Sequence, residues 1–327
     1  MPRHRMSQGA PVPDRTDASV RTLGGQPAHT PSRGRSDQEA VIVYGIHSDI
    51  GQRDSQEDRA LVVDFRTADG QVATLALIAD GIGGGTTGER ASYLAQEIIP
   101  ALLQSHTPAA SEIPAALVEA FSETNRRIHA EATTDSRRAG MGTTCTAVAI
   151  VSQRLYLAHV GDSRAYLIRG NTIQQLSIDH TWVESALQAG RPAEQLRNHP
   201  NRHVIERYLG IDPDMPIDTR YRPLGSGHGL TFVDSALQPL HLQRGDSILL
   251  CTDGVSDSLE DVQLLRLVRS RRPEQAARAV VHQALQASLR QSRLEPGHRA
   301  DNTTALVLDL PGATKVLALP RWLPWAA

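Results

Sequence analysis

The segment VATLALIADGIGGGTTG, residues 72–88, joins an apolar run to an aspartate and a glycine-rich turn. The run from Val72 to Ala79 has the length and composition of one buried strand. A second apolar run, ALVVDF, precedes it, and the turn dipeptide Asp69-Gly70 stands between the two, which predicts an antiparallel hairpin. Asp80 would then lie at the tip of a buried strand, where a carboxylate is costly unless something compensates its charge.

Other acidic residues stand in comparable places along the chain. They are Glu57 and Asp58 at the end of GQRDSQED, Asp162 in LAHVGDSRAYL, Asp253 in SILLCTDG and Asp301 at the start of DNTTALVLDL. Hard cations such as Mg²⁺ and Mn²⁺ take oxygen ligands from Asp, Glu, backbone carbonyls and water. We therefore expect the fold to gather these acids around divalent cations, as in a metal-dependent hydrolase.

Composition excludes some classes of function. The chain has 327 residues, a formal net charge of −2 and a pI near 6.7, so no global basic field favours nucleic acid or an anionic membrane. No apolar stretch is long enough for a spanning helix, and the N-terminus lacks the apolar region of a signal peptide. The two cysteines, Cys145 and Cys251, stand in apolar runs. We interpret them as buried thiols in a reducing compartment, which favours the cytoplasm.

The chain divides by composition into a tail, a long ordered region and a second tail. Residues 1–38 are rich in Pro, Gly, Ser and Arg and are expected to be disordered. Short strands come in groups, with pairs of amphipathic helices between the groups, over residues 39–311. This order predicts an α+β fold with antiparallel sheets and flanking helix pairs, because a strict βαβ alternation is absent. Residues 312–327 form an apolar tail broken by prolines.

Eight motifs in order carry a resemblance to a known family. They are GQRDSQED, DGIGGG, MGTT, VGDSRAYL, DHTWV, RHVIERYLG, CTDGVSD and DNTT. The set resembles the PP2C (PPM) family of metal-dependent protein serine/threonine phosphatases, of bacterial type. The resemblance implies a four-layer αββα sandwich of two antiparallel sheets flanked by helix pairs. It also implies hydrolysis of phosphoserine and phosphothreonine by a metal-activated water, with two or three Mn²⁺ or Mg²⁺ ions.

The same resemblance assigns roles to the motif residues. Asp80 would bridge two ions, and Gly81 would supply a backbone carbonyl. Glu57 would bind one ion, while Asp253 and Asp301 would bind the other. The remaining three assignments follow: Asp58 would orient the attacking water, Arg53 would hold the substrate phosphate, and Asp162 with Asp253 would bind a third ion. Ser163 and Arg164 are interpreted as structural.

Two places depart from the family or vary within it. Animal members carry a histidine two positions after the first aspartate, where this chain has Ile82, so the general acid stays unassigned and water is the default. Residues 182–223 match the variable flap beside the active site. His180, just before it, is interpreted as a hydrogen-bonded structural histidine.

The sequence supports two alternative functions less well. GGGTTG, residues 83–88, fits the dinucleotide-binding pattern, but no βαβ unit surrounds it. A catalytically weak, phosphoprotein-binding pseudophosphatase is the stronger alternative, although every metal position retains an acid. The resemblance implies phosphoproteins as substrates and a Ser/Thr kinase with its substrates as partners. We expect a monomer.

Overall fold

The computed structural model describes residues 42–196, 199–222, 238–295 and 297–310. The chain divides into two compact units, Met1–Gln38 and Glu39–Ala327, and all described residues belong to the second. The tails expected at 1–38 and 312–327 lie outside the described residues.

Two five-stranded sheets form the centre of the second unit. The first has the order β1-β12-β11-β8-β9 and the second β10-β7-β6-β3-β2, and every neighbouring pair is antiparallel. The first sheet consists of β1 (Val43–Asp49), β12 (Thr303–Asp309), β11 (Ser247–Cys251), β8 (Arg164–Arg169) and β9 (Thr172–Gln175). The second consists of β10 (Leu240–His241), β7 (Arg154–Val160), β6 (Cys145–Val151), β3 (Val72–Ala79) and β2 (Arg59–Arg66). A short ribbon joins β4 (Gly81–Ile82) to β5 (Gly142–Thr143).

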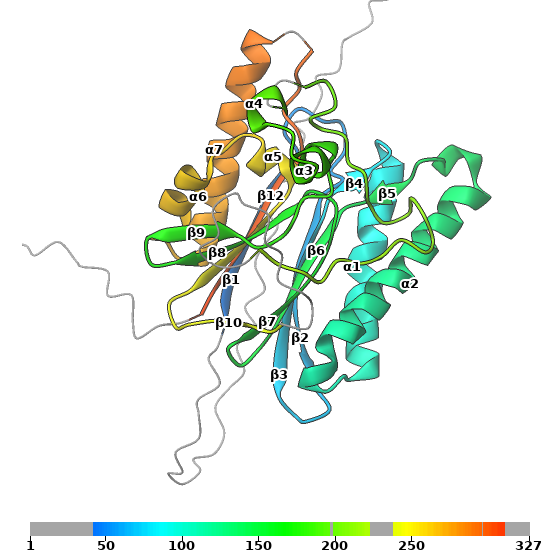
Figure 1. The fold of residues 1–327 in the computed structure, drawn as a ribbon, viewed down its shortest axis with the longest axis vertical. Helices are drawn as coiled ribbons and strands as arrows, with labels where there is room; N and C mark the ends of the chain where they lie inside the picture. Colours follow the sequence, from blue (N-terminus) through cyan, green and yellow to red (C-terminus); the bar gives the residue numbers. More distant parts are fainter. Residues whose placement is uncertain (1–41, 197–198, 223–237, 296, 311–327) are drawn as a thin grey trace, which may run out of the picture. The chain divides into compact units, whose positions relative to one another are not determined.

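Helices cover the outer faces of both sheets (Figure 1). On the second sheet lie α1 (Thr86–His106) and α2 (Ile113–Thr134), with the 3₁₀ turns η1 (Ala110–Glu112) and η2 (Ser136–Arg138) at the ends of α2. On the first sheet lie α5 (Asp253–Ser256), α6 (Asp261–Val268) and α7 (Pro273–Leu294). The short helices α3 (Trp182–Gln188) and α4 (Ala193–Leu196) belong to the predicted flap.

Strand side chains alternate between separate hydrophobic cores. In β6, Ala147 and Ala149 face the core under α1 and α2, while Val148 and Ile150 face the core between the sheets. In β11, Leu250 faces the inter-sheet core, while Leu249 packs under α5–α7. Both faces of each central strand are therefore buried, which explains why these strands are continuously apolar rather than alternating with polar residues.

The fold predictions are confirmed. β2 and β3 form the antiparallel hairpin, with Arg59 opposite Ala79 and Arg66 opposite Val72. Gly70 in the turn has φ +81°, which glycine adopts at low cost. The dinucleotide-binding alternative is wrong, because GGGTTG follows a strand of an antiparallel sheet. Cys145 and Cys251 are buried free thiols, as expected.

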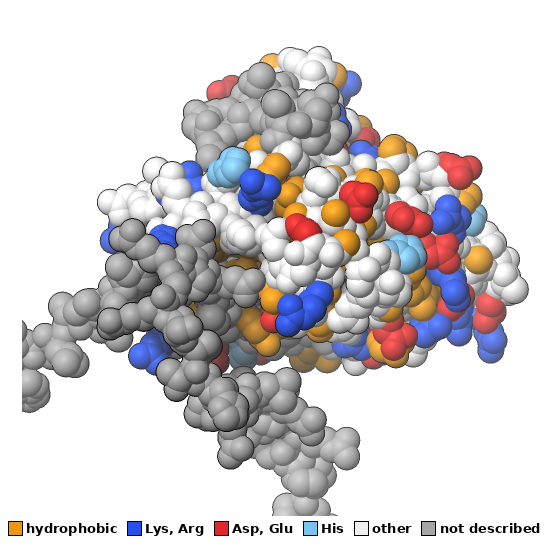
Figure 2. All heavy atoms as spheres, turned by 90° about the horizontal axis from the view of Figure 1, so that it is seen from below, with side chains coloured by type: hydrophobic (Ala, Val, Ile, Leu, Met, Phe, Trp, Pro, Cys, Tyr) orange, Lys and Arg blue, Asp and Glu red, His pale blue; other side chains and the backbone are white. Residues whose placement is uncertain are grey.

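The described surface carries charges of both signs. Figure 2 shows Arg side chains interspersed with Asp and Glu on the face seen from below. Many are paired, as where Arg126 and Arg127 both contact Glu123 on α2. None of the helices in the described ranges is long and apolar enough to cross a membrane.

Candidate metal and phosphate site

The predicted site residues lie on loops that leave the same end of each sheet. Asp80 follows β3, and the loop of Arg53, Glu57 and Asp58 leads into β2, whose first residue, Arg59, pairs with the last residue of β3. In the other sheet, β12 begins opposite the end of β1 and pairs with the end of β11. Asp301 and Asp253 therefore emerge close to each other. Asp162 lies in the turn between β7 and β8.

Electrostatics show that five of these acids converge. The pKa of Asp80 is well above its ordinary value because burial disfavours the charged form, and because other carboxylates lie near it. These neighbours are Asp58, Asp253, Asp162 and Asp301. Five acids from distant parts of the sequence thus share one region. Such mutual repulsion is typical of functional sites.

Three of the other acids, Asp253, Asp162 and Asp58, are subject to the same effects. Burial raises the pKa of Asp253 to about 7, with Asp257 and Asp301 adding repulsion. Burial also raises the pKa of Asp162, with Asp253 the largest charge contribution. The pKa of Asp58 rises to about 7, again through burial, although hydrogen bonds from Thr304 and Thr252 oppose the shift. A cation would relieve the repulsion in every case.

Carboxylate oxygens without hydrogen-bond partners indicate whether this site could hold cations. Oδ1 of Asp58, Asp162 and Asp253 are each buried without a hydrogen-bond partner. Buried polar atoms are nearly always paired, so three orphaned carboxylate oxygens in one region need an explanation. Within the described ranges, no three His, Cys, Asp or Glu side chains already stand as a metal-binding group. The donor chemistry therefore fits hard cations, and the side chains would close on an ion when it binds.

Asp58 is held from two strand ends. Its Oδ2 accepts hydrogen bonds from Thr252 Oγ1 at 3.0 Å and from Thr304 Oγ1 at 2.7 Å. These threonines lie 194 and 246 positions from Asp58. The carboxylate is thus fixed in orientation with Oδ1 left free. Sequence reasoning missed both threonines, although CTDG and DNTT contain them.

Glu57 lies against two glycines. Its Oε1 accepts hydrogen bonds from Gly85 N at 2.7 Å and Ser55 Oγ at 3.1 Å. A Cβ atom added to Gly88 would stand 1.9 Å from Glu57 Oε2 and 2.8 Å from the carbonyl carbon of Gly81. The first turn of α1 therefore packs directly between Glu57 and Gly81, two of the predicted ion ligands.

Asn302 organises the loop that carries Arg53 and Glu57. Its Oδ1 accepts the backbone N–H of Glu57 at 2.7 Å, and its Nδ2 donates to Ile50 O and Ser55 O, both at 3.0 Å. Sequence reasoning did not single out this residue. The position of Asn302 directly after Asp301 is the only local signal for it.

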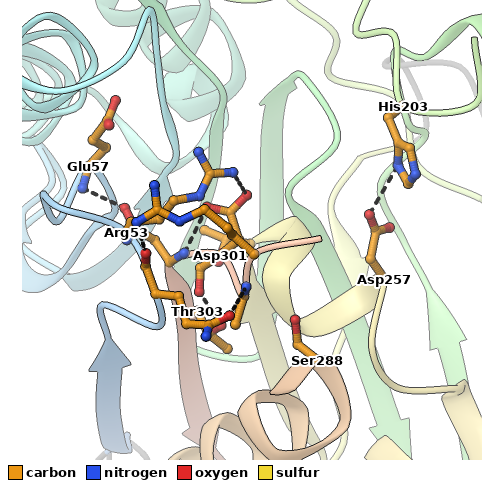
Figure 3. Close-up of polar contacts among 12 residues, drawn as sticks. Arg53, Glu57, His203, Asp257, Ser288, Asp301 and Thr303 are labelled. Carbon is orange, nitrogen blue, oxygen red and sulfur yellow. Dashed lines mark hydrogen bonds and ion pairs between the residues drawn. The ribbon is translucent and has the colours of Figure 1, made fainter. Parts of the chain in front are cut away.

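Arg53 lies beside Asp301 (Figure 3). The distance between Arg53 Nη2 and Asp301 Oδ2 is 2.5 Å, and both side chains are more than a third exposed. The predicted phosphate-binding cation thus stands next to one of the predicted metal ligands. Arg164, by contrast, donates to Asp179 at 2.6 Å, which agrees with a structural role.

A pocket of about 1370 Å³ opens over this region. Arg53, Asp162, Asp253 and Asp301 line it, whereas Glu57, Asp58 and Asp80 are absent from its lining. Its other wall contains flap residues from α3 and α4, together with His203. His203 Nδ1 stands 3.2 Å from Asp257 Oδ2, away from the Arg53–Asp301 pair (Figure 3). The described parts of the predicted flap, 182–196 and 199–222, thus border the pocket of the candidate site.

Comparison with known proteins gives the same family. The model described as "Protein phosphatase 2C" matches residues 48–292. A "Serine/threonine phosphatase stp" of Listeria welshimeri is 30% identical over 211 residues, which are 64% of this chain and 76% of that protein. The "Serine/threonine protein phosphatase PstP" of Mycobacterium tuberculosis is 34% identical over 273 residues, 83% of this chain but only 45% of that protein.

Solved structures agree with the sequence comparison. The crystal structure of the Mycobacterium tuberculosis phosphatase PstP/Ppp aligns with a TM-score of 0.62 at 29% identity, over 83% of this chain and 99% of that one. The catalytic domain of PstP in complex with two manganese ions aligns with a TM-score of 0.60 at 28% identity, over 83% and 100%. The family match spans most of the described region and the named relatives are phosphatases, so the chain belongs to the protein phosphatase 2C family of hydrolases.

Proposed function

We propose that the protein removes phosphate from phosphoserine and phosphothreonine in other proteins, using two or three Mn²⁺ or Mg²⁺ ions. The convergence of Asp80 with four other acids at one end of the sandwich supports this most strongly. The two manganese ions in the PstP complex support the choice of ion.

The ligand assignment follows the family resemblance, and contacts near Asp80 support it. Glu57, Asp80 and the Gly81 carbonyl would hold one ion, because Glu57 and Gly81 both contact the first turn of α1. Asp80 with Asp253 and Asp301 would hold the second. Asp162 and Asp253, each with an unpaired Oδ1, would hold a third. Bound ions would supply positive charge at the phosphate and lower the pKa of a water molecule.

The remaining residues position the reactants. Arg53 would turn from Asp301 to the substrate phosphate and donate two hydrogen bonds to its oxygens, which suits the planar guanidinium. Asp58 would accept a hydrogen bond from the attacking water at Oδ1, while Thr252 and Thr304 keep Oδ2 occupied. Ile82 has no proton to donate, so solvent would protonate the departing serine or threonine oxygen.

Partners and location follow from the same proposal. Phosphoproteins would be the substrates, and a Ser/Thr kinase with its targets would supply them. Cytoplasmic placement is supported by the two buried free thiols, which a reducing compartment would preserve. The monomeric state remains part of the proposal.

The test measures phosphate release from matched phosphoserine, phosphothreonine and phosphotyrosine peptides. Metal-stripped protein is assayed alone and with added Mn²⁺ or Mg²⁺, and Asp80→Asn serves as the inactive control. We expect release from the first two peptides only when an ion is added. No release under any ion, combined with retained phosphopeptide binding, would identify a binding-only pseudophosphatase instead.

A further inference from the structure

His180 is buried between the Asp162 turn and the flap. Its ring Nδ1 accepts a hydrogen bond from Gly161 N at 3.0 Å, and its own backbone N–H donates to Gly161 O at 2.7 Å. The residue is 7% exposed. Both polar groups of Gly161 are thus held by His180, immediately before Asp162 in the chain.

The other edge of the ring faces the flap. Nε2 stands 3.4 Å from Asp218 Oδ2 and 3.1 Å from Arg207 Nη1. The backbone carbonyl of His180 accepts a hydrogen bond from Glu206 N at 2.8 Å. One residue therefore contacts two separate segments of the flap through one ring edge and its own carbonyl.

The two ring nitrogens have different tasks. Because Nδ1 accepts the N–H of Gly161, the single proton of a neutral imidazole must be on Nε2, where it points to Asp218. Burial lowers the pKa of His180, and the charge of Arg207 acts in the same direction. Asp218 is held in turn by Arg220, with 2.8 Å between Nη2 and Oδ2.

The Gly161 turn also touches the support of Asp80. Gly161 has φ +108°, and an added Cβ would stand 2.5 Å from Thr144 Cβ. Thr144 Oγ1 accepts the backbone N–H of Asp80 at 3.0 Å and stands 2.7 Å from Ser163 Oγ. The turn is therefore confined on one side by Thr144 and on the other by His180, so its position sets where Asp162 enters the pocket.

We propose that His180 is a positioning residue that joins the flap to the Asp162 turn, with Nδ1 setting the turn and Nε2 setting the flap. The proposal rests on the proposed function, because it takes Asp162 as an ion ligand. It predicts that the two ring edges can be separated by substitution.

Two substitutions separate the edges. The side-chain oxygen of His180→Asn can stand near the Nδ1 position and keep the Gly161 contact, whereas the amide of His180→Gln reaches the Nε2 position and keeps the Asp218 contact. Mn²⁺ binding is measured by calorimetry, and flap order by hydrogen exchange of the amides in 204–222. The third measurement is the KM for a phosphoprotein substrate.

The two variants should fail in different ways. His180→Gln should bind its weakest Mn²⁺ about three- to tenfold less tightly, the value of one hydrogen bond, with flap protection close to wild type. His180→Asn should keep Mn²⁺ affinity, lose flap protection and raise the KM. Equal effects of both variants on Mn²⁺ affinity and on flap exchange would overturn the proposal, as would no effect of either.

A substitution at the partner of Nε2 provides a second test if either His180 variant does not fold. Asp218→Asn leaves His180 intact but places an amide where two donors already point, so it should behave like His180→Asn. Asn125→Ala is the matched control. Asn125 anchors the flap to α2 through Gly210 N, Asp212 O and Pro213 O, and its loss should leave Mn²⁺ affinity unchanged.

A fall in Mn²⁺ affinity in Asn125→Ala or Asp218→Asn would mean that any loosening of the flap weakens the ions, and the proposal would be wrong. Calorimetry and hydrogen exchange need no turnover. A wild-type protein that releases no phosphate but shows the predicted difference between the variants would refute the phosphatase proposal alone.

Discussion

Arg53 Nη2 donates a hydrogen bond to Asp301 Oδ2 at 2.5 Å, although the two residues are 248 positions apart. The pair joins the group proposed to bind phosphate to a group proposed to bind an ion. Both side chains are more than a third exposed, so the ion pair adds at most about 1 kcal/mol to stability. Its consequences should therefore be seen in binding rather than in folding.

Arg53→Gln should raise the KM for a phosphopeptide about tenfold or more, because hydrogen bonds to a charged phosphate are lost. The matched variant Arg53→Lys keeps the charge without the two-pronged geometry and should fall between wild type and Arg53→Gln. Steady-state kinetics check this. Mn²⁺ affinity should not fall in Arg53→Gln, since Asp301 is released from its ion pair. An unchanged KM would contradict the role of Arg53.

Asp80→Asn and Asp253→Asn should each reduce turnover about a hundredfold or more, because charge that stabilises the transition state is lost with the ion. In ion-free buffer both variants should be more stable than wild type. Burial and neighbouring carboxylates raise the pKa of both groups, so an ionised carboxylate at either position destabilises the ion-free fold.

Urea unfolding in a chelator, beside calorimetry with Mn²⁺, measures both effects of these variants. Glu119→Gln, at an exposed position on α2, serves as the control for loss of one negative charge. Wild-type turnover in either aspartate variant would refute the ligand assignment.

Gly88→Ala should weaken Mn²⁺ binding and destabilise the protein. Alanine is ordinarily about 1 kcal/mol better than glycine inside a helix, so any loss must come from the new methyl group. That group would stand 1.9 Å from Glu57 Oε2, which forces Glu57 or α1 to move. Ala101→Ser, exposed on the same helix, is the control. Calorimetry and thermal unfolding give the comparison, and a variant with wild-type affinity would contradict this packing.

Acid should destabilise the fold through His159. Burial lowers its pKa to about 3, and the neighbouring His180 acts in the same direction. In the unfolded chain a histidine takes up its proton near pH 6.5. Between pH 6.5 and 3 the unfolded chain therefore binds the extra proton, and the free energy of unfolding falls as pH falls, by up to about 1.4 kcal/mol per pH unit.

His159→Gln should lose this part of the pH dependence. Denaturant unfolding at pH 7, 6 and 5, in a chelator, gives the slopes for wild type and variant. The difference between the two slopes isolates His159 from the carboxylates, which titrate in both proteins. Parallel slopes would show that His159 takes up its proton as readily in the folded state as in the unfolded chain.

A chain that begins at residue 39 should keep its turnover of p-nitrophenyl phosphate and its thermal stability. The described helices and strands all follow this position, and residues 39–311 are our proposed phosphatase domain. Kinetics and thermal unfolding of the shortened protein check the prediction. A collapse of activity would place residues 1–38 within the catalytic fold.

Local patterns predicted much of the fold. Asp69-Gly70 between two apolar runs gave the β2–β3 hairpin, and the amphipathic pattern gave the helix pairs, including α1 with its buried face. Such features depend on residues a few positions apart. The pairing of β1 with β12 and the order of the strands depend on contacts across most of the chain. The family resemblance supplied the two facing sheets but not this strand order.

In the candidate site, too, local sequence predicted some features, while others depend on distant contacts. Acids at strand ends were visible because an uncompensated carboxylate there is costly. The groups that hold them were not, because Thr252, Thr304 and Asn302 act on residues more than 190 positions away. A threonine next to an aspartate has many ordinary uses, so its sequence context alone cannot reveal which distant group it contacts.

The contact between Gly81 and Gly88 limits how this enzyme can change. Since even one methyl group has no room at either position, selection cannot adjust the ion site through side chains there. An inhibitor that pressed the start of α1 outward would separate Glu57 from Gly81 without competing with phosphate.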